Sequence, residues 1–254
     1  MLTYVYTLCS ANCLGNIRGR TFAMEIIASV HTMPERVEYV AKRRNWYLAG
    51  IGRSFVMQNR LPYTNHKDLT VINLLGGPGV GKSTTAAGLF YEMKKKHFKV
   101  ELIHEWIKGE GVWEDRPALF GDQDYIFAHQ HRLQRRLIGH DIEYVITDSP
   151  ILLSLFYMPP DFPESFVPFV REVFDSYDNL NIFIDRNPEM LYTQEGRNEN
   201  MDQAIQIDAN IRAYFDNQGI DRCNVMAGDS AVIQALSAVR SHQINKQFAP
   251  VCRI

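Results

Sequence analysis

The sequence contains no apolar run long enough to cross a bilayer, and it has only four cysteines among 254 residues. The missing run excludes a protein built of transmembrane helices. Cys9, Cys13, Cys223 and Cys252 are too sparse for a disulfide framework, and no matching Cys or His pair completes a zinc site. Residues 1–16 lack the basic and apolar regions of a signal peptide. These absences predict a reducing, cytoplasmic setting and no membrane partner.

The composition is that of a globular chain, but its charge is unevenly distributed. Hydrophobic residues make up 46% and charged residues 22%, and the net charge is −2. Residues 1–66 carry eight Lys/Arg and three Asp/Glu, a net charge of +5, which leaves −7 for the remainder. Lys42, Arg43 and Arg44 adjoin Trp46 and Tyr47. This cluster indicates either contact with a nucleic-acid backbone or a solvated basic helix end, and the sequence leaves the oligomeric state open.

Alternating strand and helix patterns begin near residue 69 and predict an α/β fold. We expect strands at 69–75, 99–104, 144–147, 180–184 and 224–227. We expect helices at about 82–96, 117–139, 201–217 and 229–242, and one more with Val167, Val170, Phe174 and Tyr177 on one face. The pattern is that of a five-stranded parallel sheet covered by helices on both faces.

A small N-terminal extension precedes this domain. We assign residues 1–66 to the extension, 67–243 to the α/β domain and 244–254 to a C-terminal tail. Within the extension, residues 24–30 have the pattern of a short strand. A capping box over 32–35 opens a helix that reaches about Arg44, and the composition of 48–68 is typical of a linker.

The strand at 69–75 leads directly into a complete phosphate-binding loop of the form G-x-x-x-x-G-K-[ST]. The loop comprises Gly76, Gly77, Pro78, Gly79, Val80, Gly81, Lys82, Ser83 and Thr84. Its glycines let successive N–H groups point at a phosphate, and the following helix adds its positive end. We expect Lys82 to reach the β- and γ-phosphates of ATP and Ser83 to offer a hydroxyl to Mg²⁺. Together with the predicted parallel sheet, the loop indicates the P-loop NTPase fold.

Ligands of open parallel sheets bind beyond the carboxyl ends of the strands, where this sequence places further polar residues. Asp148 follows the strand at 144–147 and is a candidate Mg²⁺ ligand opposite Ser83; the alternative is a cap for the next element. Glu105 follows the second strand, where a carboxylate can accept a proton from an attacking hydroxyl. The alternative is a surface residue or an ion-pair partner. Phosphate acceptors need no such base, so Glu105 favours a hydroxyl acceptor.

Arg186 and Arg197 bracket a segment that we interpret as a lid, with Gly196 as a hinge. An arginine there would neutralise charge on the transferred phosphoryl group, and the hinge favours Arg197 for this role. An exposed loop with ordinary arginines is the alternative.

The helix near 117–138 adds further candidates for binding the acceptor. Gln123 can pair with the edge of a base, and Phe127 can stack on it. An amphipathic helix with a polar solvent face explains these two residues equally well. Trp106 and Arg186 complete the set of candidate acceptor contacts.

Taken together, four features resemble P-loop kinases of the thymidylate kinase and deoxynucleoside kinase group. They are the phosphate loop, His104-Glu105-Trp106, the Thr147–Pro150 strand end and the Tyr-x-x-x-Gly-Arg pattern of 192–197. The similarity covers about residues 69–240 and is greatest to bacteriophage kinases, some of which phosphorylate 5-hydroxymethyluracil in DNA. In deoxynucleoside kinases, arginine usually follows the aspartate that corresponds to Asp148, whereas Ser149 follows here.

The resemblance implies an ATP- and Mg²⁺-dependent kinase in which Glu105 is the base and Lys82 and Arg197 are catalytic. We expect the acceptor to be a hydroxyl of a nucleoside-like group, with a lean towards hydroxymethyluracil in phage DNA. A deoxynucleoside or deoxynucleoside monophosphate kinase is the alternative. An ATP-driven switch and a nucleotide-binding module without catalysis are further alternatives from other classes.

Overall fold

A computed structural model describes residues 16–17, 20–21, 47–51, 54–58, 65–109, 117–190, 192 and 199–248. The chain forms two compact units, residues 1–60 and 61–254, and each is described by itself. No helix in these described ranges is both long and apolar enough to span a membrane.

The first unit contains short antiparallel strand pairs. β1 (Asn16–Ile17) pairs with β2 (Arg20–Thr21), and β3 (Tyr47–Ile51) pairs with β4 (Ser54–Gln58). The prediction of a linker over 48–68 is therefore wrong for the β3–β4 hairpin. In the register of this hairpin Leu48 is paired with Met57 and Ala49 with Val56. The strand and helix predicted at 24–30 and 32–44 lie outside the described residues.

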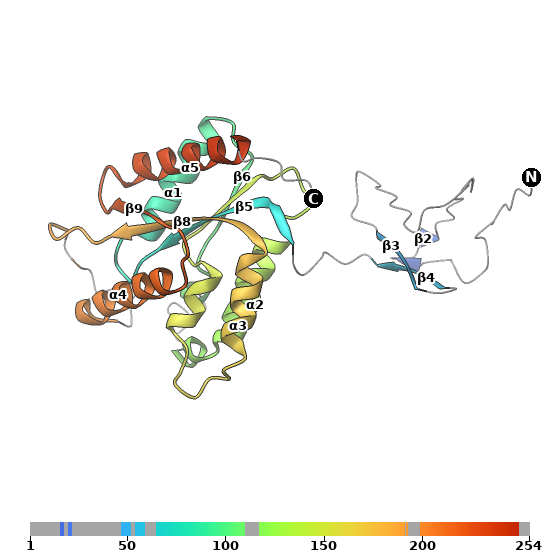
Figure 1. The fold of residues 1–254 in the computed structure, drawn as a ribbon, viewed down its shortest axis with the longest axis horizontal. Helices are drawn as coiled ribbons and strands as arrows, with labels where there is room; N and C mark the ends of the chain where they lie inside the picture. The colour runs from blue at the N-terminus through green and yellow to red at the C-terminus, as the bar shows by residue number, and fades with distance from the viewer. Residues whose placement is uncertain are drawn as a thin grey trace, which may run out of the picture. The chain divides into compact units, whose positions relative to one another are not determined.

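The second unit is built on a five-stranded parallel sheet, which confirms the predicted fold class (Figure 1). Its strands are β5 (His66–Leu75), β6 (Val100–Ile103), β7 (Tyr144–Thr147), β8 (Tyr177–Asp185) and β9 (Cys223–Met226). Their order across the sheet is β6-β7-β5-β8-β9. The chain therefore leaves β5 in the middle, crosses to the edge at β6, and later returns to the other side of β5 at β8. The carboxyl end of β5 is thus a topological switch point, where ligands of such sheets bind.

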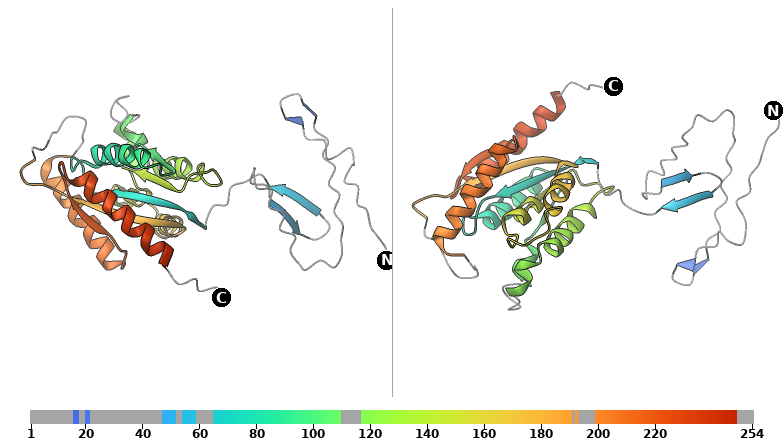
Figure 2. Two further views of the ribbon diagram at one scale, coloured as in Figure 1. Left: turned by 90° about the horizontal axis from the view of Figure 1, so that it is seen from above. Right: turned by 60° about the horizontal axis from the view of Figure 1, so that its bottom comes forward.

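Helices cover both faces of the sheet (Figures 1 and 2). α1 (Lys82–Lys95) and α5 (Ala231–Phe248) contact each other and lie on one face. α2 (Gln123–Arg135), η4 (Ile151–Phe156), α3 (Phe166–Asp175) and α4 (Met201–Asn217) cover the other. Alternate residues of β5 supply both cores, because Ile72 and Leu74 face α1 whereas Val71 and Leu75 face α2 and α3.

Several element boundaries differ from the predictions. The helix expected at 117–139 is divided into η3 (Pro117–Gly121) and α2. Tyr177 is not on the face of α3 but begins β8, where it pairs with His66. The Ser176 hydroxyl donates to the Val173 carbonyl at 2.6 Å at the end of α3. α5 continues through Phe248, so the predicted tail at 244–254 begins too early.

Candidate active site

The phosphate loop connects the carboxyl end of β5 to the start of α1. Gly76 and Gly81 have φ angles of 133° and 94°, a region in which a side chain would be strained. Gly81 is also the N-cap of α1, and no side chain caps this end. The first N–H groups of α1 therefore remain available, and a helix N-terminus with available N–H groups favours an anion such as phosphate.

Lys82 lies within the loop that it is expected to serve. Its Nζ donates to the carbonyl of Gly76 at 2.8 Å and to that of Gly77 at 3.0 Å. Burial lowers the pKa of Lys82, and the carboxylates of Glu105 and Asp148 partly oppose this shift. The cation that the motif provides for phosphate is thus close to the two predicted acidic site residues. Ser83 and Thr84 follow it, exposed at the start of α1.

Asp148 is buried at the end of β7, with 3% of its surface exposed. Its Oδ1 accepts no hydrogen bond from the described residues. The hydroxyl of Thr147, not Asp148, accepts the Ser149 N–H at 3.1 Å, and no side chain caps η4. The capping alternative therefore finds no support in these contacts. A buried oxygen without a partner, close to Lys82, fits a hard cation such as Mg²⁺.

Ser83 and Asp148 would be the protein ligands of this ion. The described residues contain no group of three or more His, Cys, Asp or Glu side chains that could hold a metal. Mg²⁺ commonly binds one or two protein oxygens and takes its other ligands from substrate phosphates and water.

Glu105 follows β6 and is partly exposed. Burial raises its pKa, and Asp148 and Glu199 raise it further, while Lys82 and Lys108 oppose the shift. A carboxyl group with a raised pKa is a stronger base once it is ionised, as proton abstraction from a hydroxyl requires.

Trp106, beside Glu105, belongs to an aromatic cluster. Its ring stacks on His129 with centroids 4.2 Å apart, and Tyr125 meets its edge at 5.2 Å. Sequence reasoning did not identify Tyr125 and His129 as site residues. Their spacing of four along α2, which places them on one helix face, was the available signal.

The remaining residues of α2 contribute in ways that differ from the prediction. Phe127 is 1% exposed and packs edge-on against Phe166 in the core, so its ring offers no face for a base. Gln123 is also buried, and its Nε2 donates to the Phe120 carbonyl at 2.7 Å. Gln130, which was not predicted, donates to the Thr147 hydroxyl at 3.2 Å and so ties α2 to the end of β7.

Arg186 follows β8 and contacts the phosphate loop. Its Nε lies 2.9 Å from Oδ2 of Asp208, and its Nη2 donates to the Pro78 carbonyl at 3.1 Å. Arg197 and Gly196 lie outside the described residues, so the predicted lid arginine stays a prediction. A hollow beside the loop is lined by Gly79, Val80, Arg186, Asn187, Met190, Tyr192, Met201 and Ala227.

The sequence was then compared with known proteins. A protein-family model described as an AAA domain, AAA_28, matches residues 71–231. The match covers more than half of the chain and includes the phosphate loop, Glu105 and Asp148. The chain belongs to this AAA domain family. No relative was found among curated proteins.

Solved structures that resemble this AAA domain include a NadR protein, a deoxyadenosine kinase and an APS kinase. The NadR protein in complex with NR superposes with a TM-score of 0.52 at 16% identity, over 69% of this chain and 52% of that one. Deoxyadenosine kinase from M. mycoides superposes with a TM-score of 0.41 at 15% identity, over 69% of this chain and 99% of that one. The APS kinase CysC of Mycobacterium tuberculosis superposes with a TM-score of 0.36 at 10% identity, over 68% of this chain and 97% of that one. We take the shared fold from the NadR match alone, in which the chain spans about half of the other protein.

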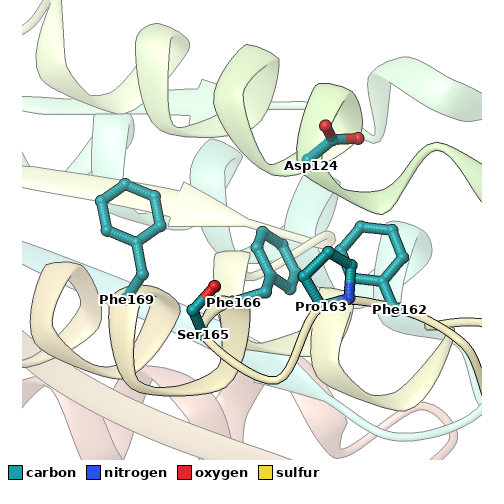
Figure 3. A pocket seen from close by; sticks show the side chains of 6 residues that line it. All are labelled: Asp124, Phe162, Pro163, Ser165, Phe166 and Phe169. Carbon is teal, nitrogen blue, oxygen red and sulfur yellow. The ribbon is translucent and has the colours of Figure 1, made fainter.

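A second concavity of the AAA domain lies between α2 and α3 (Figure 3). This groove of about 350 Å³ is lined by Asp124, Phe162, Pro163, Ser165, Phe166 and Phe169. Its lining shares no residue with the phosphate loop or with the strand ends described above. The groove therefore does not belong to the candidate active site.

Proposed function

We propose that this protein is an ATP-dependent phosphotransferase that transfers the γ-phosphate to a hydroxyl of a nucleoside-like acceptor. The observation that carries the proposal is the convergence of Lys82, Glu105 and Asp148 at the carboxyl end of the sheet. Their charges act on one another although they come from three different strand ends. This arrangement supplies a phosphate-binding cation, a base and a metal ligand in one place.

Each residue has a defined task in the proposed reaction. Lys82 and the loop N–H groups hold the β- and γ-phosphates of ATP. Glu105, in its ionised form, accepts the proton of the acceptor hydroxyl, whose oxygen then forms a bond to the γ-phosphorus. The bond between that phosphorus and the β–γ bridging oxygen breaks, and ADP leaves with the electron pair. Mg²⁺ held by Ser83 and Asp148 would neutralise negative charge on the phosphates.

The family name AAA domain also fits an ATP-driven switch that hydrolyses ATP. Such a protein needs a group that activates water, often a carboxylate beside the metal-binding aspartate. Asp148 is followed by Ser149 and Pro150, neither of which can serve as that base. The position of Glu105 near Lys82 favours transfer to an acceptor. Glu105 follows β6 whereas the candidate metal ligand Asp148 follows β7, and this separation leaves room for the acceptor between base and metal.

Within the kinase class, we propose a hydroxymethylpyrimidine in DNA as the acceptor. The support is the resemblance to phage kinases and the net charge of +5 on residues 1–66, which suits a nucleic-acid backbone. A deoxynucleoside or deoxynucleoside monophosphate kinase is the competing proposal. A monophosphate kinase differs in its chemistry, because an anionic phosphate acceptor needs no base and its reaction would survive the loss of Glu105.

The variant Glu105→Gln tests the proposed reaction, with Glu101→Gln as a matched control on β6, the strand that precedes Glu105. Glu101 forms an ion pair with Lys94 at 3.0 Å and is not part of the site. Loss of a general base lowers turnover by about 10²- to 10⁴-fold, so we expect this loss in kcat for Glu105→Gln with unchanged ATP affinity. Turnover that persists at the level of the control would refute a base at this position.

A further inference from the structure

α4 carries a carboxylate at a core position. The helix begins at Met201 because Asn200 and Gln203 form a capping box, each side chain bonding the other's backbone N–H at 2.9 Å. Ala204, Asp208, Ile211 and Phe215 then follow one another at spacings of four, three and four and are all buried. Asp208 thus occupies a place in the apolar stripe of α4, where an aspartate is costly unless it is paired.

Asp208 is paired with the phosphate loop and with Arg186. Its Oδ1 accepts a short hydrogen bond from the Gly77 N–H, and its Oδ2 accepts from Nε of Arg186 at 2.9 Å. Arg186 in turn donates to the Pro78 carbonyl at 3.1 Å. The side chains of Asp208 and Arg186 are 10% and 15% exposed, so little water competes for these bonds.

The fit between α4 and the loop is close enough to require glycine at position 77. A Cβ on Gly77 would lie 2.4 Å from the Ala204 carbonyl oxygen and 2.9 Å from Oδ1 of Asp208. Side chains do not approach other atoms so closely. The loop backbone therefore rests directly on α4, and the Gly77 N–H points at the carboxylate.

These contacts hold the loop independently of Lys82. Lys82 also ties the first part of the loop through the carbonyls of Gly76 and Gly77. The bonds from Asp208 and Arg186 go to other groups, the Gly77 N–H and the Pro78 carbonyl. They therefore do not depend on where the Lys82 ammonium points.

We propose that Asp208 is a positioning residue, which with Arg186 keeps the phosphate loop in its nucleotide-binding shape. This inference rests on the proposed function only in that the loop binds a nucleotide. Arg186 also connects the loop to the residues on either side of 193–198. Arg186 lies over the Tyr192 ring at 6.0 Å, and the Tyr192 hydroxyl donates to the Glu199 carbonyl at 2.6 Å, just before the capping box of α4.

Affinity for a fluorescent ATP analogue with Mg²⁺, measured on the full chain, tests the proposal. Asp208→Asn keeps an oxygen for the Gly77 N–H but loses the charge opposite Arg186, and Asp208→Ala loses both. The matched control is Asp216→Asn. Asp216 is an exposed aspartate of the same helix, and it forms an ion pair with Arg222, which lies beyond the end of α4. Asp208→Asn loses the charge-assisted hydrogen bond with Arg186 that holds the loop in shape. We therefore expect its Kd for the analogue to rise about tenfold, and the Kd of Asp208→Ala to rise further.

The split of kinetic constants separates positioning from simple loss of stability. We expect the KM for ATP to rise in parallel with Kd, with an unchanged KM for the acceptor. A residue that only stabilised the fold would lower the melting temperature and leave the Kd of the folded protein unchanged. A Kd for Asp208→Asn equal to that of Asp216→Asn would overturn the proposal. This comparison decides the test even if Asp208→Ala fails to fold. If the unaltered protein binds no nucleotide, both this inference and the proposed function fail.

Discussion

The variant Asp148→Asn should change stability in opposite directions without and with the nucleotide. The Asp148 carboxylate is 3% exposed and its Oδ1 has no hydrogen-bond partner among the described residues. A buried polar group left unsatisfied costs about 1–3 kcal/mol, and a neutral amide is cheaper to bury than a carboxylate. In EDTA, which removes Mg²⁺, we therefore expect Asp148→Asn to raise the free energy of unfolding by about 1 kcal/mol.

With Mg²⁺ and a non-hydrolysable ATP analogue, the order should reverse. A ligand present at a hundred times its Kd stabilises the folded state by about 2.7 kcal/mol. The unaltered protein gains this stabilisation, whereas Asp148→Asn loses the negative charge of a metal ligand and gains less. Urea denaturation in both conditions measures the four free energies of unfolding.

The matched control is Asp185→Asn, at the end of β8. Asp185 accepts hydrogen bonds from Arg212 and Asn224, so its loss should destabilise the protein in both conditions. If Asp148→Asn is destabilised in EDTA as much as Asp185→Asn, then Asp148 has a structural partner and the metal-site reasoning is wrong.

Three further predictions follow from the same contacts. Because burial raises the pKa of Glu105 above its ordinary 4.5, kcat/KM should rise with pH through this higher value, and Glu105→Gln should abolish this limb of the pH profile. Burial would raise the pKa of Asp178, but hydrogen bonds from His242, Lys246 and Thr70 outweigh it and lower the pKa. Asp178 therefore contributes stability above the pKa of the unfolded chain that is lost as pH falls towards the folded pKa. Asp178→Asn should cost about 1.5–3 kcal/mol at pH 7 in urea denaturation, with a smaller difference at pH 2. Phe215→Ala, on the buried face of α4, should cost about 3–5 kcal/mol by the same method; a loss below 1 kcal/mol would contradict the packing described.

The sequence was sufficient to predict features that depend on local patterns. The strand at 144–147 and the helix at 201–217 have the predicted bounds, because short apolar runs and helical patterns are local signals. The phosphate loop was recognisable because its chemistry requires a fixed spacing of glycines and lysine.

Contacts between distant parts of the chain were not predictable in this way. Gly77, Arg186 and Asp208 are brought together only because β8 lies beside β5 and α4 packs on the loop. Phe127 was misjudged for the same reason, since nothing in its local sequence shows that α3 covers its ring. Tyr177 continued the helical periodicity of α3, although its pairing with His66 places it in β8.

Transfer of labelled γ-phosphate from ATP with Mg²⁺ to a panel of acceptors tests the central claim most directly. The panel comprises deoxynucleosides, deoxynucleoside monophosphates, plain duplex DNA and DNA that contains 5-hydroxymethyluracil. We predict label on an acceptor hydroxyl, with the strongest signal on the modified DNA and a rate of labelling about 10²- to 10⁴-fold lower with Glu105→Gln. Label on monophosphates alone would contradict the role of Glu105, and ATP turnover without any labelled acceptor would contradict the phosphotransferase itself.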